Sequence, residues 1–372
     1  MRKSLTYKIL AAVLALSAVN VFVPHNMLAY DITSDNTTIS TAPINENIYG
    51  NGYSFTINGG TNYGKVFGAG NDNQDYDKDA CGGNVTINGN AEVTYAVYGG
   101  YADGGNAYDN EIIISGSANI ENADLYGSNY SSDYGNTGNT LTINGWSGST
   151  NSVQNFNDIA FKNIDWNDEE PVLRITAGNA DHLDKTTIDT IHIAGGSNIN
   201  VGESMTLIKS GNSNDLGLTE DNVTDTFTAG VAREGLGSTS VNTTTGEVTF
   251  NIDSIKLSSQ AVSAAQTRAA SAAFVNQGTD LISDSLDTIS RDDNYGVKTF
   301  AALHGNRSKY DVADDIKING WSTIVGVGNA DKFDNGSEFS WGVFYENGSG
   351  NYRTYNSFNN EFFRGDGSMV YN

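Results

Sequence analysis

Short runs of alternating apolar and polar residues recur in the first half of the chain at a nearly constant interval. One such element appears as Thr56-Ile57-Asn58-Gly59, Thr86-Ile87-Asn88-Gly89, Ile113-Ile114-Ser115-Gly116 and Thr142-Ile143-Asn144-Gly145. A second follows the first three copies, as Val66-Phe67-Gly68-Ala69-Gly70, Val97-Tyr98-Gly99-Gly100 and Leu125-Tyr126-Gly127-Ser128. Both return after about 30 residues, a period typical of solenoids, whose units must stack because none buries its own apolar face.

The second copy predicts three short strands, Asn84–Ile87, Ala91–Thr94 and Tyr95–Tyr98, separated by Gly and Asn turns. Alternation along these strands places Val85, Ile87, Val93 and Val97 inside. The sequence therefore predicts an all-β fold, with a parallel β-helix over residues 30–257. At ~4.8 Å per coil, about seven coils would make a rod near 35 Å long. A β-sandwich of many short strands has the same composition and is the alternative.

The repeat becomes irregular after Trp146, although residues 151–257 keep a strand-and-turn composition. Strand-like segments continue there, at Val172–Thr176, Ile188–Ala194, Ser204–Ile208 and Glu247–Ile252. We expect later coils of diverged sequence that end in a cap.

Three loops of similar placement separate the repeated elements, Asn71–Gly83, Tyr101–Asn110 and Asn129–Asn139. Insertions at one phase of a solenoid emerge on one face, so these loops should form a strip rich in Asp, Asn and Tyr. Such a strip suits a glycan or protein ligand, but a solvated edge without a ligand has the same composition.

One of these loops has a spacing that resembles a calcium site. Asp72, Asp75, Asp77 and Asp79 are the candidate ligands, because calcium prefers several hard oxygens in a Gly-turned loop. Ala80 stands where such a loop has its turning Gly, and no Glu closes the loop in register. A solvated acidic loop is the alternative, and no other cofactor is indicated.

The composition changes abruptly at Leu257. Residues 258–276 contain seven Ala between Ala261 and Ala273 and no Gly or Pro, which predicts a helix. Residues 258–293 are therefore a linker. Longer antiparallel strands are predicted after it, at Val297–Gly305, Ile316–Gly328, Glu338–Glu346 and Asp366–Tyr371.

The third of these strands has an aromatic and apolar side. Phe339, Trp341, Val343 and Tyr345 alternate with small or polar residues, with Phe344 as the exception. A membrane barrel needs strands of ~9–11 residues with an apolar outer face. A soluble antiparallel sheet is the alternative.

The N-terminus has the form of a secretory signal peptide. Arg2, Lys3 and Lys8 precede an apolar run from Ile9 to Val23, and Ala29 offers a small residue for cleavage. A membrane anchor is the alternative, but the run is short for the ~20 residues of a spanning helix. We therefore expect residues 1–29 to be removed and the rest to be exported.

Charge and cysteine content exclude several classes of function. The 372 residues include 20 Lys+Arg and 44 Asp+Glu, a net charge of −24, which disfavours nucleic acid as a partner. The single cysteine, Cys81, allows neither an intramolecular disulfide nor a Cys-based zinc site.

The order of these segments resembles the autotransporters, the type V secreted proteins of diderm bacteria. Ala269–Gly278 is similar to their pore helix. Several residues and motifs in the C-terminal region resemble the first strands of their translocator barrel. They are Phe300, Gly320-Trp321, Gly326-Val327-Gly328, Trp341–Glu346, Gly348, Gly350 and Tyr352. The resemblance implies that residues 30–257 are a passenger domain, carried through an outer-membrane barrel with the help of the barrel-assembly machinery. It also implies display on the cell surface.

The C-terminal region departs from this family in its number of strands. Residues 294–372 supply about four, whereas a membrane barrel needs at least ~8 and the family's barrels have about 12. Its last residues, Tyr371-Asn372, also lack the terminal aromatic strand of the family. We therefore expect a truncated autotransporter-like protein with an incomplete antiparallel barrel.

The sequence gives little support for catalysis, so we expect no enzyme. His25, His182, His192 and His304 lie in unrelated contexts, without a metal-binding or nucleophile motif. Asp165-Trp166-Asn167-Asp168-Glu169-Glu170 gathers carboxylates beside a Trp, as in a glycosidase, but a charged loop is the simpler interpretation. The predicted function is a structural or adhesive surface passenger that binds glycans or proteins. A polysaccharide hydrolase or lyase and an inert spacer are the alternatives.

Overall fold

The computed structural model divides into two compact units, Met1–Lys256 and Leu257–Asn372. The structure describes residues 29–42, 45–70, 78–129, 137–167, 170–177, 183–213, 215–265, 267–268, 271–272, 282–284, 296–312, 314–356 and 361–371. The predicted signal peptide therefore lies outside the described residues except for Ala29, which begins strand β1. The chain is mostly β, as predicted, and contains large parallel sheets.

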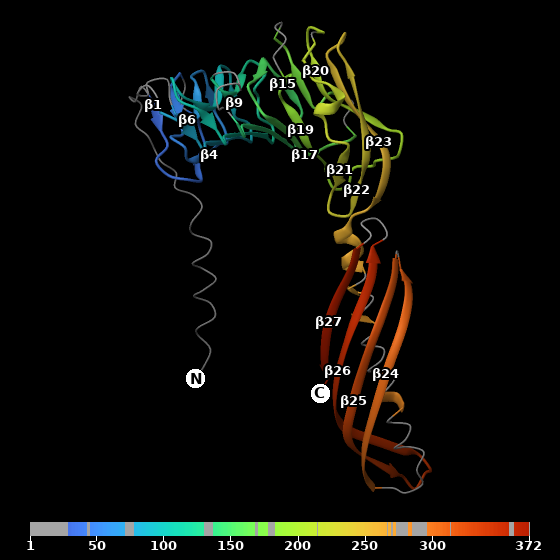
Figure 1. Ribbon diagram of the computed structural model, residues 1–372. Helices are drawn as coiled ribbons and strands as arrows, with labels where there is room; N and C mark the ends of the chain where they lie inside the picture. The colour runs from blue at the N-terminus through green and yellow to red at the C-terminus, as the bar shows by residue number, and fades with distance from the viewer. Residues whose placement is uncertain are drawn as a thin grey trace, which may run out of the picture. The chain divides into compact units, whose positions relative to one another are not determined.

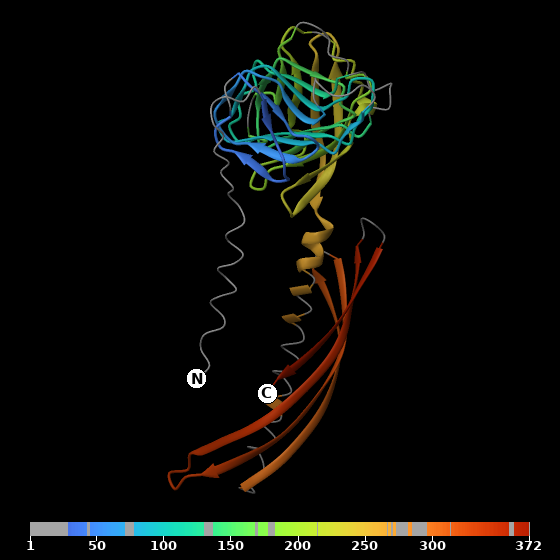
Figure 2. The same cartoon turned by 90° about the vertical axis from the view of Figure 1, so that its left-hand side faces the viewer.

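Two main sheets make up the first unit (Figures 1 and 2). Sheet A has the order β1 (Ala29–Asp31), β3 (Asn47–Tyr49), β6 (Val66–Gly70), β10 (Ala96–Tyr101), β13 (Asp124–Ser128) and β16 (Ser152–Gln154). Sheet B runs from β2 (Thr37–Ile39) through β4 (Ser54–Ile57), β8 (Asn84–Ile87), β12 (Glu111–Ser115), β14 (Thr140–Asn144), β17 (Asp158–Ile164) and β19 (Thr187–Ile193). It continues with β21 (Thr226–Ala229), β22 (Arg233–Asn242), β23 (Glu247–Leu257), β20 (Ser204–Ser210), β18 (Leu173–Ile175) and β15 (Gly148–Thr150).

The repeated sequence elements align as parallel neighbours. Ile57, Ile87, Ile114 and Ile143 pair in succession on sheet B, and Val66, Val97 and Leu125 pair in succession on sheet A. All of these side chains are fully buried in one core cluster. The predicted inward residues Val85, Ile87, Val93 and Val97 are buried as well. We call each copy of the repeat, with its strand on each sheet, a coil.

The Asn-Gly turns of the repeat have a backbone reason for their glycine. Gly89 and Gly145 have φ of +62° and +59°, which side chains with a Cβ adopt only with strain. A Cβ on Gly89 would also lie 2.5 Å from the carbonyl oxygen of Asn58 in the previous coil. The recurrent glycine therefore lets successive turns lie directly against one another.

Buried asparagines that directly precede strands of sheet B link neighbouring coils, and we call them the asparagine ladder. The Asn139 side-chain oxygen accepts from the backbone N–H of Asn110 (3.2 Å) and from its side-chain amide (2.9 Å). The Asn139 amide donates to the carbonyl of Ala107 at 2.8 Å, and the Asn139 backbone N–H donates to the side chain of Asn157 at 2.9 Å. The ladder gives hydrogen-bond partners to backbone groups that the strands leave unpaired. Backbone groups in a buried segment need such partners.

Two of the three predicted loops stack on each other: β7 (Ala80–Cys81) pairs in parallel with β11 (Ala107–Tyr108), whereas residues 130–136 of the third loop lie outside the described residues. Elsewhere in the coils, β5 (Thr61–Asn62) pairs in parallel with β9 (Glu92–Val93). In a small second core, Ala80 of β7 and Ala107 of β11 cluster with Ala69 of β6 and with Ala102.

Antiparallel pairing replaces parallel pairing at the end of the first unit, where the sequence predicted a cap. β20 pairs antiparallel with β23, and β21 with β22; the short 3-10 helix η1 (Glu220–Asn222) lies between β20 and β21 in the chain. Phe227 and Phe250 pack edge to face here, with ring centroids 6.0 Å apart. The ion pairs Lys209–Glu247 and Lys256–Glu234 link the paired strands.

The second unit contains helical residues 259–265 and a four-stranded antiparallel sheet. Ser258 caps the helix, because its Oγ accepts from the N–H of Ala261 at 3.1 Å. Helix is also described at residues 267–268, 271–272 and 282–284, and most of the segment that resembles a pore helix lies outside the described residues. No helix in the described part of the chain is long and apolar enough to cross a bilayer.

The four strands are longer than the sequence predicted. They are β24 (Gly296–Val312), β25 (Asp314–Lys332), β26 (Glu338–Asn356) and β27 (Glu361–Tyr371), hydrogen-bonded in chain order. The polar segments 306–312 and 347–356 join the strands, because pairing in an antiparallel sheet continues wherever the partner strand continues. The described strands do not close into a barrel, since β24 and β27 are not neighbours.

The asparagine ladder allows a direct test of this packing. Replacing Asn139 by Ala removes an acceptor from the buried Asn110 and should destabilise the first unit by about 1–3 kcal/mol. Asn106→Ala is the control, because the exposed Asn106 bonds Asp79 through its backbone N–H. Hydrogen exchange of the full chain measures the stability of the first unit in both variants. Equal protection in the two variants would contradict a stabilising ladder.

Candidate functional site

A column of four stacked aromatic rings crosses the outer face of sheet A. Tyr49, Phe67, Tyr98 and Tyr126 lie at matching positions of β3, β6, β10 and β13. Successive ring centroids are 5.2, 5.3 and 4.8 Å apart, and the ring planes differ by 25°, 9° and 11°. Tyr101 packs edge-on against Phe67 and Tyr98. We call Tyr49, Phe67, Tyr98 and Tyr126 the ring column.

The local sequence explains why the rings align. In each strand the residue before the ring points into the core, so the ring must point outward. A glycine follows each ring, at Gly50, Gly68, Gly99 and Gly127, and a Cβ there would lie 2.3 to 3.0 Å from a carbonyl oxygen of the next coil. Sequence reasoning used these segments to find the repeat but missed the column. The recurrent aromatic-Gly pair was the signal that could have revealed it.

A second column, polar except for Ala96, runs beside the rings. Ala96 pairs with Asp124, and Asp124 pairs with Ser152. Lys65 has the equivalent position on the neighbouring strand, because it directly precedes Val66, which pairs with Val97. Asp124 Oδ1 accepts from the Asn151 amide and from the Ser152 hydroxyl, both at 2.7 Å. The Asn47 amide donates to the Tyr49 hydroxyl at 3.1 Å. Hydroxyl, amide and carboxylate groups thus border the column. Tyr49 and Phe67 are buried, so a ligand would reach only the half-buried Tyr98 and Tyr126.

The environment of Tyr98 favours its neutral phenol. Burial raises the pKa of Tyr98 above its ordinary value, and the neighbouring Tyr126, Tyr101, Tyr95 and Asp124 raise it further. Asp124 is therefore close enough to the rings to act on them electrostatically.

The predicted calcium ligands lie mostly outside the described residues. Asp72, Asp75 and Asp77 are not described, while Asp79 Oδ1 accepts from the backbone N–H of Asn106 at 2.8 Å. In the described part of the chain, no group of three or more His, Cys, Asp or Glu side chains could hold a metal ion. The calcium site stays a prediction, and Asp79 serves to join two neighbouring loops.

The carboxylate run near Trp166 is described only in part, because Asp168 and Glu169 lie outside the described residues. Asp165 Oδ1 accepts from the backbone (3.0 Å) and amide (2.9 Å) of Asn167, and Glu170 pairs with Arg174 at 3.2 Å. Each described carboxylate thus has a local partner.

The two described histidines belong to different units and have different surroundings. His192 bridges Asn163 and the carbonyl of Gly230, whereas His304 lies on β24 in the other unit and His182 is not described. The described residues therefore bring no pair of these groups into an arrangement suited to catalysis.

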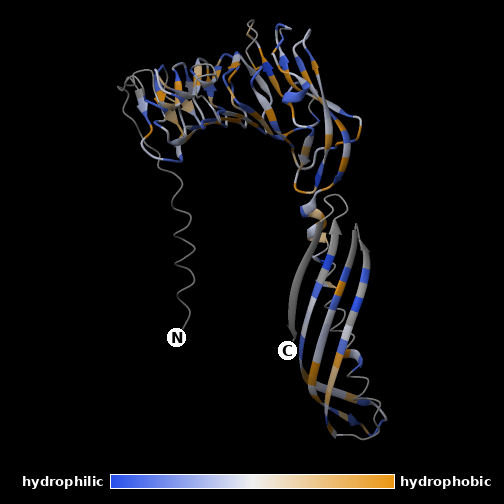
Figure 3. Cartoon of the chain, viewed as in Figure 1, coloured by the Kyte–Doolittle hydropathy of each residue, from blue (hydrophilic) through white to orange (hydrophobic). Residues whose placement is uncertain are grey.

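The C-terminal sheet exposes its apolar residues. On β24, β25 and β26 the odd-numbered residues share one face, here called the outer face, since Ala301 pairs with Val325 and Val325 with Tyr345. Large exposed side chains on it are Val297, Leu303, Trp321, Val325, Phe339, Trp341, Val343 and Tyr345. Figure 3 shows this mixture of hydrophobic and hydrophilic positions along the strands.

The opposite face of the same sheet is the covered one. Ile318, Ser322, Ile324, Ala330 and Glu346 are all buried there. Phe300 lies over Gly326, where a Cβ would be 2.2 Å from the ring. The predicted sidedness of Phe339, Trp341, Val343 and Tyr345 is thus confirmed, with Val343 63% exposed and Glu346 2% exposed.

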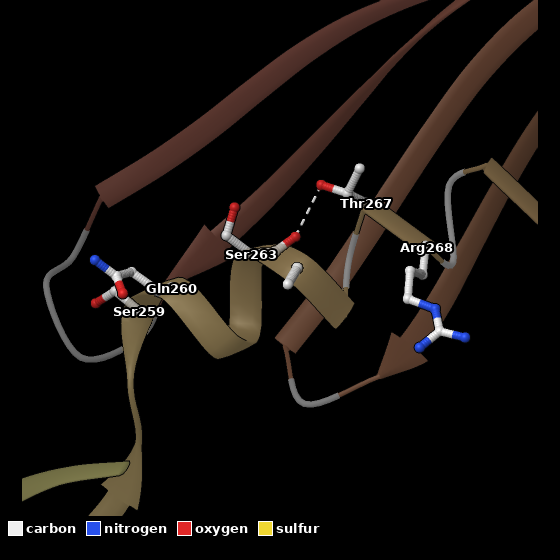
Figure 4. Close-up of a pocket in the computed structure, with 6 residues that line it drawn as sticks. Ser259, Gln260, Ser263, Thr267 and Arg268 are labelled. Atoms are coloured by element: carbon white, nitrogen blue, oxygen red, sulfur yellow. Dashed lines mark hydrogen bonds between the residues drawn. The ribbon is translucent and has the colours of Figure 1, made fainter. Parts of the chain in front are cut away.

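A hollow lies on the helical segment of the second unit (Figure 4). Ser259, Gln260, Ser263, Ala264, Thr267 and Arg268 line it, and Thr267 donates to the carbonyl of Ser263 at 2.9 Å. All six residues come from the helical residues 259–265 and 267–268, so functional groups from other described elements do not converge on the hollow. The ring column is therefore the stronger candidate.

Comparisons with known proteins identify no relative: no protein-family model matches the sequence, and no curated protein or solved structure matches the chain. The functions of the ring column and of the outer face of the C-terminal sheet are therefore inferred from their geometry.

The pKa of Tyr98 predicts a change in alkaline stability. Because the pKa of Tyr98 is higher in the folded state than in the unfolded state, its protonated phenol contributes to the free energy of unfolding. This contribution is fully present below pH about 10 and is lost as the pH rises above that value. Tyr98→Phe keeps the ring and removes the proton, so the variant should lose less stability than the wild type above pH about 10. Urea unfolding at several pH values measures this. Tyr63→Phe, at an exposed position, is the control and should follow the wild type.

Proposed function

We propose that this chain is an autotransporter-like surface protein, with a β-helical adhesive passenger over residues 30–257 and part of an outer-membrane barrel over residues 294–372. The observation that carries the proposal is the exposed apolar outer face of β24–β26. In water, such a face would cost free energy in proportion to its apolar area. In a bilayer, the same face is stabilised.

The dimensions of the outer face support a membrane location. Trp321 lies at one end of the apolar stretch of β25, and Phe339 pairs with Asp331, ten residues further along that strand. At ~3.4 Å per residue and a tilt of about 40°, these ends span roughly 26 Å. Membrane barrels have an apolar band of ≈ 25 Å with aromatic girdles at both interfaces. The open edges of β24 and β27 would need further strands in a bilayer, because unpaired backbone groups there cost several kcal/mol each.

The first unit supports the role of a passenger. Its chain alternates between sheets A and B, and its parallel registers repeat every coil, as in a β-helix. It has no disulfide, since Cys81 is the only cysteine, and its stability comes from stacking. The half-buried Tyr98 and Tyr126, with the polar groups beside them and the loop layer, would give it a surface for glycan or protein ligands.

Charge placed at the centre of the apolar band tests the membrane role. Val325→Arg should lower the fraction of the chain that enters outer membranes or phospholipid vesicles, because Arg at the bilayer midplane costs about 2–4 kcal/mol. Asn319→Arg is the matched control, on the same strand and face but beyond the band. Flotation with vesicles measures both. Equal flotation of the two variants would contradict the proposal.

Ligand binding tests the adhesive role separately. The full chain, in detergent or displayed on cells, should bind a defined subset of a glycan and protein array through the first unit. Tyr126→Ala should weaken that binding, while Tyr63→Ala, at an exposed tyrosine outside the ring column, should not. An array without any ligand would leave an inert spacer as the function.

A further inference from the structure

Basic residues gather on the outer face of the C-terminal sheet, beyond one end of its apolar band. Lys309 of β24 pairs with Lys317 of β25, and Lys317 pairs with Arg353 of β26. Arg307 belongs to the neighbouring row, where it pairs with Asn319. The four cationic residues are all exposed. We call Arg307, Lys309, Lys317 and Arg353 the basic patch.

The register of the strands brings like charges directly opposite one another. Residues opposite each other on antiparallel strands have Cβ atoms ~4.5–5.5 Å apart, and like charges at such positions destabilise a sheet. Lys309, Lys317 and Arg353 occupy three successive positions of one row, so their charges repel. Anions that lie against this row would offset the repulsion. The patch therefore favours a ligand surface that carries several negative charges.

Carboxylates of the same strands offset only part of this charge. In the row beyond the patch, Asp311 pairs with Asp315. β27 continues the two rows of the patch with one carboxylate, Asp366, and one further cation, Arg364. Among the residues that the register places in these three rows, cations outnumber carboxylates by five to three. The local charge is thus positive, although the chain has a net charge of −24.

The patch lies where the headgroups of a bilayer would begin. Trp321 lies at the nearer end of the apolar band, and Asn319 and Lys317 are two and four residues further along the same strand. At ~3.4 Å per residue and a tilt of about 40°, their rows lie roughly 5 and 10 Å beyond Trp321. The headgroup layer is about 5–8 Å thick on each side of a bilayer. Long Lys and Arg side chains reach back into that layer.

The other end of the band carries a carboxylate instead. Phe339 pairs there with Asp331, whose Oδ2 accepts from the Asn329 amide at 2.9 Å. Lys332 lies on the opposite face of the sheet, 3.8 Å from its partner Glu338. The two ends of the outer face therefore differ in charge, and only the end with the basic patch suits an anionic surface.

We propose that the basic patch binds the phosphate groups of anionic membrane lipids. This inference rests on the membrane location proposed above and names the lipid class that the outer face selects. Each Lys or Arg near an anionic membrane surface contributes about fivefold in affinity. Arg307 and Arg353 can each donate two parallel hydrogen bonds to one phosphate, whereas the lysines act as point charges. Phosphatidylglycerol and lipid A share this chemistry, and the experiment below separates them.

Flotation of the full chain with vesicles of defined composition tests the proposal. The vesicles contain phosphatidylcholine alone, phosphatidylcholine with phosphatidylglycerol, or phosphatidylcholine with lipid A. We expect association with at least one anionic vesicle to be about fivefold or more stronger than with the neutral vesicle. General electrostatics would give the opposite result, because a net charge of −24 repels an anionic surface. The preferred anionic vesicle identifies the source of the phosphate.

Three variants separate the patch from the total charge. Lys317→Gln removes the central cation of the row and should reduce the preference for anionic vesicles about fivefold. Adding Arg353→Gln should abolish that preference. Lys332→Gln is the matched control, on the same strand but on the opposite face and at the other end, and should keep the preference. Neutral vesicles should bind all variants as they bind the wild type, because the apolar band is unchanged.

The possible failures of this proposal and of the membrane location differ. Equal association of the wild type with neutral and anionic vesicles would overturn the lipid site while leaving the membrane location intact. Equal losses for Lys317→Gln and Lys332→Gln would mean that the total charge, and not the patch, selects the lipid. A chain that floats with no vesicle of any composition would overturn both the lipid site and the membrane location.

Discussion

The apolar side chains of one coil reach a dry environment only when another coil lies against them. The column Ile57, Ile87, Ile114 and Ile143 is fully buried because each isoleucine is covered by the ones before and after it. Burying such a side chain contributes about 1.5–3 kcal/mol, but no coil obtains this contribution alone. The first unit therefore depends on a parallel register that repeats without slipping.

Buried polar groups hold that register in place. A one-residue slip would move every inward side chain of a strand to the outer face. It would also separate Asn110 from Asn139, whose side chains bond each other and the backbone of neighbouring coils. Apolar burial thus supplies most of the stabilisation, whereas the asparagine ladder gives the observed register a lower free energy than registers shifted by one residue.

The sequence predicted the parts of this fold that repeat. The interval of about 30 residues, the inward positions Val85, Ile87, Val93 and Val97, and the sidedness around Trp341 all follow from short-range periodicity, and the structure confirms them. The strand ends were predicted less well, because β25 and β26 extend through polar residues wherever their partners provide hydrogen bonds. The ring column could not be predicted from one strand, since Tyr98 contacts Tyr126 only after the 27 residues between them have closed a coil. The aspartates at 72, 75 and 77 lie outside the described residues, so their role stays a prediction.

The coils that carry the repeat are similar in length, since Ile57, Ile87, Ile114 and Ile143 follow one another after 30, 27 and 29 residues, and this similarity has a thermodynamic consequence. Closing each coil costs a similar loop entropy, because that cost depends only on the logarithm of the number of residues between paired positions. Adding or removing a coil should then change the total stability by a nearly constant increment, as in a one-dimensional chain of coupled units. Cooperativity in such a chain extends only as far as neighbouring coils remain strongly coupled. The stack can therefore melt in segments, and a single transition temperature would describe it poorly.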